Sequence, residues 1–417
     1  MSRLMKRRRS LLRRVILLTA LALVFPGWFA FDRPQAQQAP NQQAQRPRRV
    51  KNGDEPPEMK LKKPDTPSAG DEVDEGDVVR VDTQLVSVPA VVTDSAGRPI
   101  SGLRPDNFRL IEDGQVQTIT NFGTSETPFE IALLLDTSGS TRDDVALIRS
   151  AANSFIEALR PGDRVGVVAF NTAQTVAEPV ATVEVLAPLT SDRDALRGAI
   201  ENLGASNGTP YYDALERVAD SIFREPPREE MRGRRAIVAL TDGVDSASNS
   251  DFATAKMKLS RAGIACYFIQ VNTEDFVEDR LMKDCQDDGR LALSQRQIER
   301  YRQIFVPSAK AETFNNFCEM GPFERMSISR ELYNLARREM NDLAKGSGGR
   351  SFVAATLADA RAAFARVAAD IGTFYSIGYY PTNKARDGKY RAIKLEVRGV
   401  KDKTQIRARD GYYAPKQ

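Results

Sequence analysis

A run of five consecutive apolar residues, Ile131 to Leu135, is followed directly by an acidic residue and two nearby serines. Apolar residues without alternation predict a strand that is covered on both faces, as in a parallel sheet flanked by helices. Such sheets bind ligands at the carboxyl ends of their strands. We therefore expect the three polar residues, Asp136, Ser138 and Ser140, to lie at the edge of a sheet where binding sites form.

Asp136, Ser138 and Ser140 alternate along the chain, so an extended loop could turn their three side-chain oxygens to the same side. Carboxylate and hydroxyl oxygens without a neighbouring Cys or His match hard cations. The alternative is structural. In that interpretation one of the serines caps the helix that is expected to start at residues 141–144.

Two later stretches have the same character. Thr209 precedes a proline at the predicted start of a helix, and Asp242 follows a second apolar strand, 236–241. Each has a structural alternative. Thr209 fits an N-cap position before a proline in the first helical turn. Asp242 begins an Asp-Gly pair that is common in turns, and Asp245 is the nearest other carboxylate.

The order of these motifs, Asp-x-Ser-x-Ser, a loop Thr and a strand-ending Thr-Asp-Gly, resembles the metal ion-dependent adhesion site of von Willebrand factor type A domains. The five matching positions are Asp136, Ser138, Ser140, Thr209 and Asp242. The resemblance implies that the three hydroxyls coordinate Mg²⁺ (or Mn²⁺ or Ca²⁺) directly or nearly so, while the two Asp residues act largely through bound water. It further implies a non-enzymatic adhesion module in which an Asp or Glu carboxylate of a protein partner completes the coordination of the metal.

Residues 126–372 alternate strands and helices, which predicts an α/β domain with a doubly wound, mostly parallel Rossmann-like sheet. Compared with the family it resembles, this domain carries an insertion at about 273–326, which contains Cys285 and Cys318. In an oxidising compartment these two cysteines could pair as a disulfide, or they could remain separate thiols. Cys266 lies within a predicted buried strand, where we expect an unreactive core thiol.

The segments on either side of this domain have strand patterns. Alternating apolar and polar residues predict a β module at 78–125, and strands return at 373–417, where six of the eleven tyrosines lie. We expect the two segments to form one small β-sandwich into which the α/β domain is inserted. Its tyrosines should pack in the core and be anchored by their hydroxyls, the alternative being an exposed aromatic adhesion face. With the Gly-Tyr-Tyr-Ala-Pro tail at 411–415, the arrangement is similar to secreted bacterial proteins of this family.

The N-terminal 77 residues predict export. Residues 1–31 combine a cationic segment with an uncharged stretch, which is typical of a secretory signal peptide, the alternative being a retained membrane anchor. In both cases the rest of the chain should be exported: periplasmic, associated with the cell envelope, or secreted. Residues 32–77 are rich in Gln, Pro and charged side chains without an apolar period, which predicts a disordered linker.

Composition excludes several functions. Seven of the cationic side chains lie in residues 1–14, so the formal charge of +4 becomes −3 for the remainder, and no nucleic-acid-binding surface is expected. The chain has no His, which excludes imidazole acid–base chemistry and His-ligated zinc. Two alternatives to adhesion remain: a metal-dependent hydrolase or phosphotransferase using Asp136 as nucleophile, and a scaffold with a vestigial site. The enzyme is disfavoured because position 138, where that class usually has a second carboxylate, is Ser.

Overall fold

The computed structural model describes residues 85–124, 126–138, 145–175, 179–226, 233–282, 293–309, 320–400 and 403–416. Residues 1–77 and 78–417 form two units, and only the second contains described residues. The predicted signal peptide or anchor, the predicted linker, Ser140, Cys285 and Cys318 all lie outside the described residues. Within the described ranges, no helix is both long enough and apolar enough to cross a membrane.

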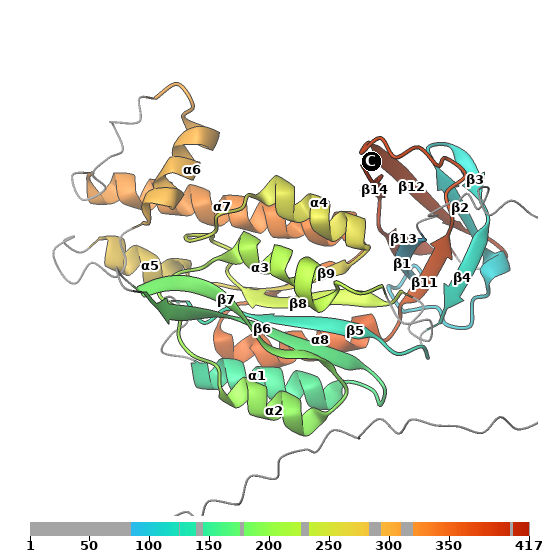
Figure 1. The fold of residues 1–417 in the computed structure, drawn as a ribbon, viewed down its shortest axis with the longest axis horizontal. Helices are drawn as coiled ribbons and strands as arrows, with labels where there is room; N and C mark the ends of the chain where they lie inside the picture. The colour runs from blue at the N-terminus through green and yellow to red at the C-terminus, as the bar shows by residue number, and fades with distance from the viewer. Residues whose placement is uncertain are drawn as a thin grey trace, which may run out of the picture. The chain divides into compact units, whose positions relative to one another are not determined.

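A six-stranded sheet forms the centre of the second unit, with strand order β10-β9-β8-β5-β6-β7 (Figure 1). Neighbouring strands pair in parallel, except for the antiparallel pair β6 and β7. Every residue of β5, β8 and β9 is buried, as their unbroken apolar runs predict. The predicted doubly wound, mostly parallel α/β sheet is therefore confirmed. Its strands are β5 (Glu130–Leu135), β6 (Arg164–Gln174), β7 (Pro179–Thr190), β8 (Arg235–Thr241), β9 (Ala265–Val271) and β10 (Arg350–Ala354).

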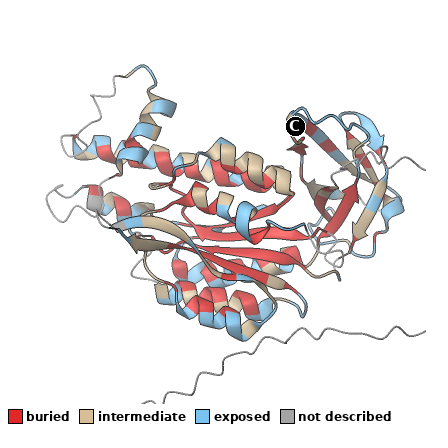
Figure 2. Cartoon of the chain, viewed as in Figure 1, coloured by how far each residue is buried: buried red, intermediate tan, exposed pale blue. Residues whose placement is uncertain are grey.

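Helices cover both faces of this sheet. One apolar core lies under α1, α2 and α8, and a second lies under α3, α4 and α7. Figure 2 shows the buried strands as a red layer between the two sets of helices. A π-helix, η4 (Val218–Ile222), continues α3, and a 3-10 helix, η8 (Leu357–Asp359), precedes α8. The covering helices are α1 (Val145–Ala158), α2 (Arg193–Glu201), α3 (Tyr211–Arg217), α4 (Phe252–Ala262), α7 (Pro322–Ser347) and α8 (Ala360–Ile371).

The predicted insertion contributes two short helices, α5 (Glu274–Leu281) and α6 (Gln295–Phe305). They pack on α7 through a separate apolar cluster that includes Val277, Ile298 and Leu332. Residues 322–326, predicted as the end of the insertion, instead form the start of α7. The insertion is therefore an extension of the α/β domain with its own small core.

Two four-stranded antiparallel sheets form a sandwich, with strand orders β13-β1-β11-β4 and β14-β12-β2-β3. Strand β1 pairs with β11 and β13, and β2 pairs with β12, so both ends of the chain build both sheets. One apolar core contains residues of the two sheets. This confirms the predicted sandwich of N- and C-terminal strands around an inserted α/β domain. Its elements are β1 (Val86–Thr93), η2 (Pro105–Asn107), β2 (Phe108–Glu112), β3 (Gln115–Gln117), β4 (Ile119–Gly123), β11 (Tyr375–Tyr379), β12 (Tyr390–Val397), β13 (Gln405–Ala408) and β14 (Gly411–Tyr413).

Three of the six tail tyrosines pack in this core, while Tyr380 and Tyr390 are exposed. The hydroxyl of Tyr375 donates to the carbonyl of Ile100 at 2.8 Å. The hydroxyls of Tyr379 and Tyr412 donate to Glu112 at 2.5 and 3.1 Å. Tyr375, Tyr379 and Tyr412 are buried, as the interpretation of hydroxyl-anchored packing expects.

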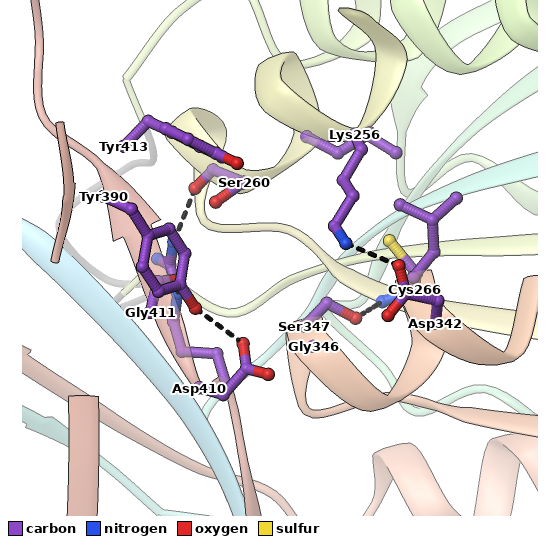
Figure 3. A pocket seen from close by; sticks show the side chains of 13 residues that line it. Lys256, Ser260, Cys266, Asp342, Gly346, Ser347, Tyr390, Asp410, Gly411 and Tyr413 are labelled. Carbon is purple, nitrogen blue, oxygen red and sulfur yellow. Dashed lines mark hydrogen bonds and ion pairs between the residues drawn. The ribbon is translucent and has the colours of Figure 1, made fainter. Parts of the chain in front are cut away.

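The sandwich meets the α/β domain along α4, the end of α7 and β14. A cavity of about 240 Å³ lies at this junction, between the Lys256–Asp342 ion pair and the hydrogen bond from Tyr390 to Asp410 (Figure 3). Beside it, the buried guanidinium of Arg409 donates to the carbonyls of Gly411, Ser87 and Ser260 at 3.1, 2.7 and 2.5 Å. One side chain thereby joins β14, β1 and α4.

Candidate metal-binding site

Three loops come together at the carboxyl end of the central sheet. Strands β5 and β8 are parallel neighbours in which Leu135 lies opposite Leu240. The N–H of Asp136 continues this ladder by donating to the carbonyl of Leu240 at 3.0 Å. The third loop, which contains Thr209, is attached to the loop after β5: the N–H of Ser206 donates to the carbonyl of Thr137 at 2.8 Å. The parallel register therefore places the Asp-x-Ser and Thr-Asp-Gly segments side by side.

The carboxylate of Asp136 is 1% exposed and spans two strand ends. One oxygen accepts the N–H of Ser138 at 3.0 Å, and the other accepts the hydroxyl of Thr241 at 2.6 Å. The N–H of Gly243 in turn donates to the Thr241 oxygen at 2.9 Å. The pKa of Asp136 is raised to about 7, mainly by burial and secondly by the negative charge of Asp242. Asp136 and Asp242 are thus close enough for their like charges to repel.

The carboxylate of Asp242 is also buried and is oriented by two residues that the sequence motif does not contain. It accepts the N–H of Val244 at 3.0 Å and the hydroxyl of Thr273 at 2.6 Å. The Thr273 hydroxyl shares a second hydrogen bond, 2.8 Å long, with Tyr333 of α7. Burial, followed by the charge of Asp242, raises the pKa of the Tyr333 phenol well above its ordinary value, so it stays protonated.

The hydroxyl-bearing residues Ser138 and Thr209 are 2% and 7% exposed. The N–H of Thr209 donates to the Ser246 hydroxyl at 2.8 Å, and the N–H of Ser246 donates to the Thr209 carbonyl at 3.0 Å. The loop after β8 therefore holds the backbone of Thr209 on both sides. The structure brings Asp136, Ser138, Thr209 and Asp242 to one edge of the sheet, while the fifth predicted ligand, Ser140, lies outside the described residues.

Helix α3 is capped by Asp245, and not by Thr209 as the structural alternative supposed. The carboxylate of Asp245 accepts the N–H groups of Tyr211 and Tyr212 at 2.9 and 3.3 Å. Burial raises the pKa of Asp245, and its hydrogen bonds to Ser248 and to the helix oppose that shift. The capping contact crosses 34 positions of the chain, so local sequence could not reveal it.

The chemistry of the donor set fits a hard divalent cation. The four described side chains offer only carboxylate and hydroxyl oxygens. Among the described residues, no three His, Cys, Asp or Glu side chains form a metal-binding group, so binding here needs the hydroxyls as well as the carboxylates. The charge of the buried Asp242 helps to raise the pKa of Asp136, and a divalent cation bound beside the two carboxylates would relieve this repulsion.

Comparison with known proteins identifies the domain. The family model described as von Willebrand factor type A domain matches residues 131–244, from β5 to just beyond Asp242. The chain contains a von Willebrand factor type A domain. Such domains are typically protein-interaction modules, commonly bind protein partners and are generally not enzymes. The match spans all five positions of the predicted site.

Several solved structures are similar to parts of the chain. A von Willebrand factor type A protein from Catenulispora acidiphila is 13% identical, with 81% of this chain and 75% of that chain covered and a TM-score of 0.36. The SpRpn10 VWA domain is 16% identical, with 35% and 76% covered and a TM-score of 0.27. Proximal thread matrix protein 1 from the mussel byssus is 18% identical, with 36% and 38% covered and a TM-score of 0.28. At such low identities and TM-scores these likenesses say nothing about function. No curated protein sequence matches the chain.

Proposed function

We propose that this chain is an exported adhesion module that binds Mg²⁺ at the carboxyl ends of the strands in its type A domain and uses the ion to bind a carboxylate of a protein partner. The hydroxyls of Ser138, Ser140 and Thr209 would hold the ion, and Asp136 and Asp242 would act mainly through bound water. The observation that carries the proposal is the buried pair Asp136 and Asp242, placed at the ends of adjacent parallel strands beside Ser138 and Thr209. Export is proposed from the leader-like residues 1–31.

Neighbouring hydroxyl groups orient the two carboxylates of this site. Thr241 and Thr273 donate hydroxyl hydrogen bonds to the two carboxylates and hold each in one orientation. Ser138 and Thr209 contribute neutral oxygens. A bound Mg²⁺ with mainly neutral direct ligands would supply an electrophilic position that an acidic side chain of a partner can occupy.

The hydrolase alternative is less well supported. The carboxylate of Asp136 accepts hydrogen bonds from Ser138 and Thr241, which would compete with its use as a nucleophile. Position 138 offers a hydroxyl where the enzyme class would need a second carboxylate as acid–base group.

Metal binding is tested by isothermal titration of the metal-free chain with Mg²⁺ and Mn²⁺. We expect one site in the wild type and loss of binding heat in Asp136→Ala and Thr209→Ala. Asp194→Ala, which removes a carboxylate whose side chain is 87% exposed, is the matched control and should bind as the wild type does. Equal heats in all four proteins would contradict the proposed site.

Adhesion is tested with the same variants as baits for cell-envelope proteins. A partner should be retained by the wild type in Mg²⁺, be released by EDTA, and fail to bind the Thr209→Ala variant. Blocking the partner's carboxyl groups chemically should also abolish retention. Retention that survives EDTA would contradict a metal-mediated contact.

A further inference from the structure

Helix α6 of the insertion contacts the loop that follows β8. The hydroxyl of Ser294, the N-cap residue of α6, donates to the carbonyl of Ser246 at 2.8 Å. The guanidinium of Arg296 donates to the carbonyl of Ala247 at 3.1 Å, to that of Ser248, and to the side-chain oxygen of Asn249 at 2.9 Å. The first turn of α6 therefore holds four consecutive residues of this loop, 246–249.

The loop residue Ser246 connects α6 to the candidate site. It exchanges two hydrogen bonds with the backbone of Thr209, of 2.8 and 3.0 Å. Thr209 is a predicted metal ligand, so a single residue separates α6 from the site. A displacement of the loop would displace Thr209 with it.

A second contact joins α6 to the first turn of α3, directly after Thr209. Arg300 donates to both carboxylate oxygens of Glu339 on α7 at 2.7 Å, and Glu339 accepts the hydroxyl of Tyr212 at 2.7 Å. The Arg300 guanidinium also lies over the Tyr212 ring, 4.7 Å from its centroid. Tyr212 and Glu339 are buried, so this ion pair is shielded from solvent.

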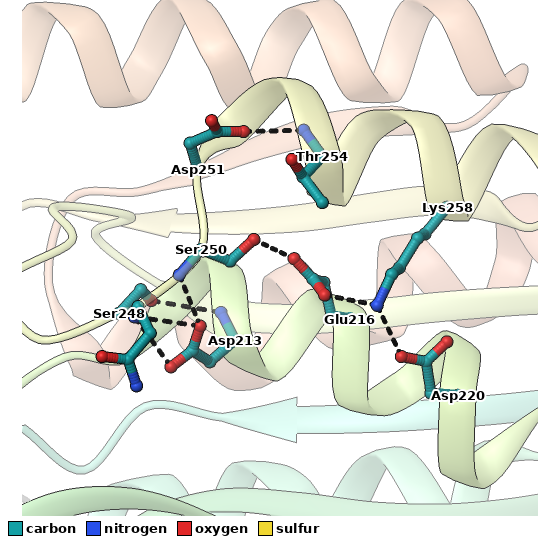
Figure 4. A network of polar contacts seen from close by, with 9 residues as sticks. Asp213, Glu216, Asp220, Ser248, Ser250, Asp251, Thr254 and Lys258 are labelled. Atoms are coloured by element: carbon teal, nitrogen blue, oxygen red, sulfur yellow. Dashed lines mark hydrogen bonds and ion pairs between the residues drawn. The ribbon is translucent and has the colours of Figure 1, made fainter.

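The far side of the same loop is fixed to α3 and α4 (Figure 4). Asp213 accepts the N–H groups of Asn249 and Ser250, at 3.0 and 2.9 Å. Ser250 donates to Glu216, and Lys258 of α4 pairs with Glu216 and with Asp220. The loop and α3 are therefore bonded to each other. Helix α6 contacts the loop directly and reaches α3 through Glu339 and Tyr212.

We propose that the contacts of α6 with the 246–249 loop and with Glu339, here called the α6 clamp, set the metal affinity of the site by holding Thr209 in place. This inference rests on the function proposed above. Arg296 and Arg300 are positioning residues, since they act through the 246–249 loop and through Tyr212. The apolar contacts of α6, such as Ile298, supply packing independently of these two side chains. Loss of residues that orient metal ligands typically weakens metal binding by about 10- to 100-fold.

The test is Mg²⁺ and Mn²⁺ titration calorimetry on the full chain and on single variants. Arg296→Ala and Arg300→Ala should each bind about 10- to 100-fold more weakly than the wild type. Arg302→Ala, which removes the same charge from the same helix, should bind with wild-type affinity. Arg300→Lys should restore most of the affinity, because an ammonium can still pair with Glu339.

The outcomes separate the two proposals. A wild-type chain that binds neither ion overturns the proposed function and the clamp together. A wild-type chain that binds, while Arg296→Ala and Arg300→Ala bind equally well, overturns the clamp alone, even where thermal stability falls. Arg296 is exposed, so its variant should fold and carries the test if Arg300→Ala does not fold.

Discussion

The two ends of strand β5 each hold a buried carboxylate, Glu130 at the start and Asp136 just past the end, and each residue is 1% exposed. Glu130 is neutralised within the protein, by Arg164 at 2.7 Å and by Arg235 at 2.8 Å. Asp136 instead lies close to a second carboxylate, Asp242, whose charge helps to raise its pKa. Burial is the same at both ends, but the neighbours differ: two guanidiniums pair with Glu130, whereas a second carboxylate lies close to Asp136.

This difference separates a structural carboxylate from a candidate ligand. A buried ion pair with good geometry satisfies both partners and needs nothing from outside the chain. Two buried carboxylates at neighbouring strand ends, beside hydroxyl groups, form a set of oxygens suited to a divalent cation. Stability should therefore depend on Glu130, and metal binding should depend on Asp136.

The largest effect is expected at the start of the strand. Glu130→Gln leaves the largely buried guanidiniums of Arg164 and Arg235 without their counter-charge, and should lower the free energy of unfolding by about 3 kcal/mol or more. Urea unfolding monitored by circular dichroism measures this. The Mg²⁺ affinity of the folded fraction should stay at the wild-type value. A weaker affinity would contradict the assignment of a purely structural role to Glu130.

The converse change is at the other end of the strand. Asp136→Asn keeps the shape of the side chain and removes one of the repelling charges, so the metal-free chain should be as stable as the wild type or more stable. Mg²⁺ binding should weaken by about 10- to 100-fold or be lost. Urea unfolding in EDTA and in Mg²⁺ measures both quantities. A variant that is strongly destabilised in EDTA would show that Asp136 is structural, as Glu130 is.

The strands of the central sheet could be predicted from the sequence because unbroken apolar runs such as 131–135 and 236–240 match strands that are buried on both faces. The proximity of the Asp136 and Asp242 loops followed from the geometry of parallel strand ends, whereas Thr209, which precedes α3, was placed at the site by the family resemblance. The tail is harder to predict: residues 405–413 have the pattern of a single strand, yet two strands, β13 and β14, form there and belong to different sheets. Strand alternation specifies the side-chain faces and does not specify the partner strand.

The residues that orient the site could not be predicted. Asp245, Thr273, Tyr333 and Arg300 make their contacts across long stretches of the chain. A polar residue near a strand end, such as Thr273 two positions after β9, carries a weak signal that alone does not identify its partner. Tertiary contacts of this kind depend on packing that no local pattern encodes.

A moderate effect is expected for the buried carboxylate of the sandwich. Glu112 is 2% exposed and accepts the hydroxyls of Tyr379 and Tyr412. In Glu112→Gln the amide oxygen can still accept a hydrogen bond, so the free energy of unfolding should fall by about 1–2 kcal/mol. Differential scanning calorimetry measures the change. Mg²⁺ binding should be unaffected, and altered binding would show that the sandwich influences the site.

The smallest effect is expected at Cys266, buried within β9. Burial raises the pKa of its thiol to about 12, so at pH 8 the group is protonated and unreactive in the folded chain. Iodoacetamide at pH 8, followed by peptide mapping, should modify Cys266 only after unfolding. Modification in the folded chain would contradict its burial. The same map under non-reducing conditions tests the predicted disulfide, since Cys285 and Cys318 recovered as free thiols would exclude it.

The central claim is that a divalent cation binds at the carboxyl ends of β5 and β8. Anomalous scattering from a crystal grown in Mn²⁺ tests it most directly. The account predicts a single strong anomalous peak at the carboxyl end of β5 and β8, within about 2.2 Å of the hydroxyls of Ser138 and Thr209. This peak should be absent from crystals of the Asp136→Asn variant. A fully ordered edge of the sheet with no peak at saturating Mn²⁺, or a peak held by other residues, would contradict the account.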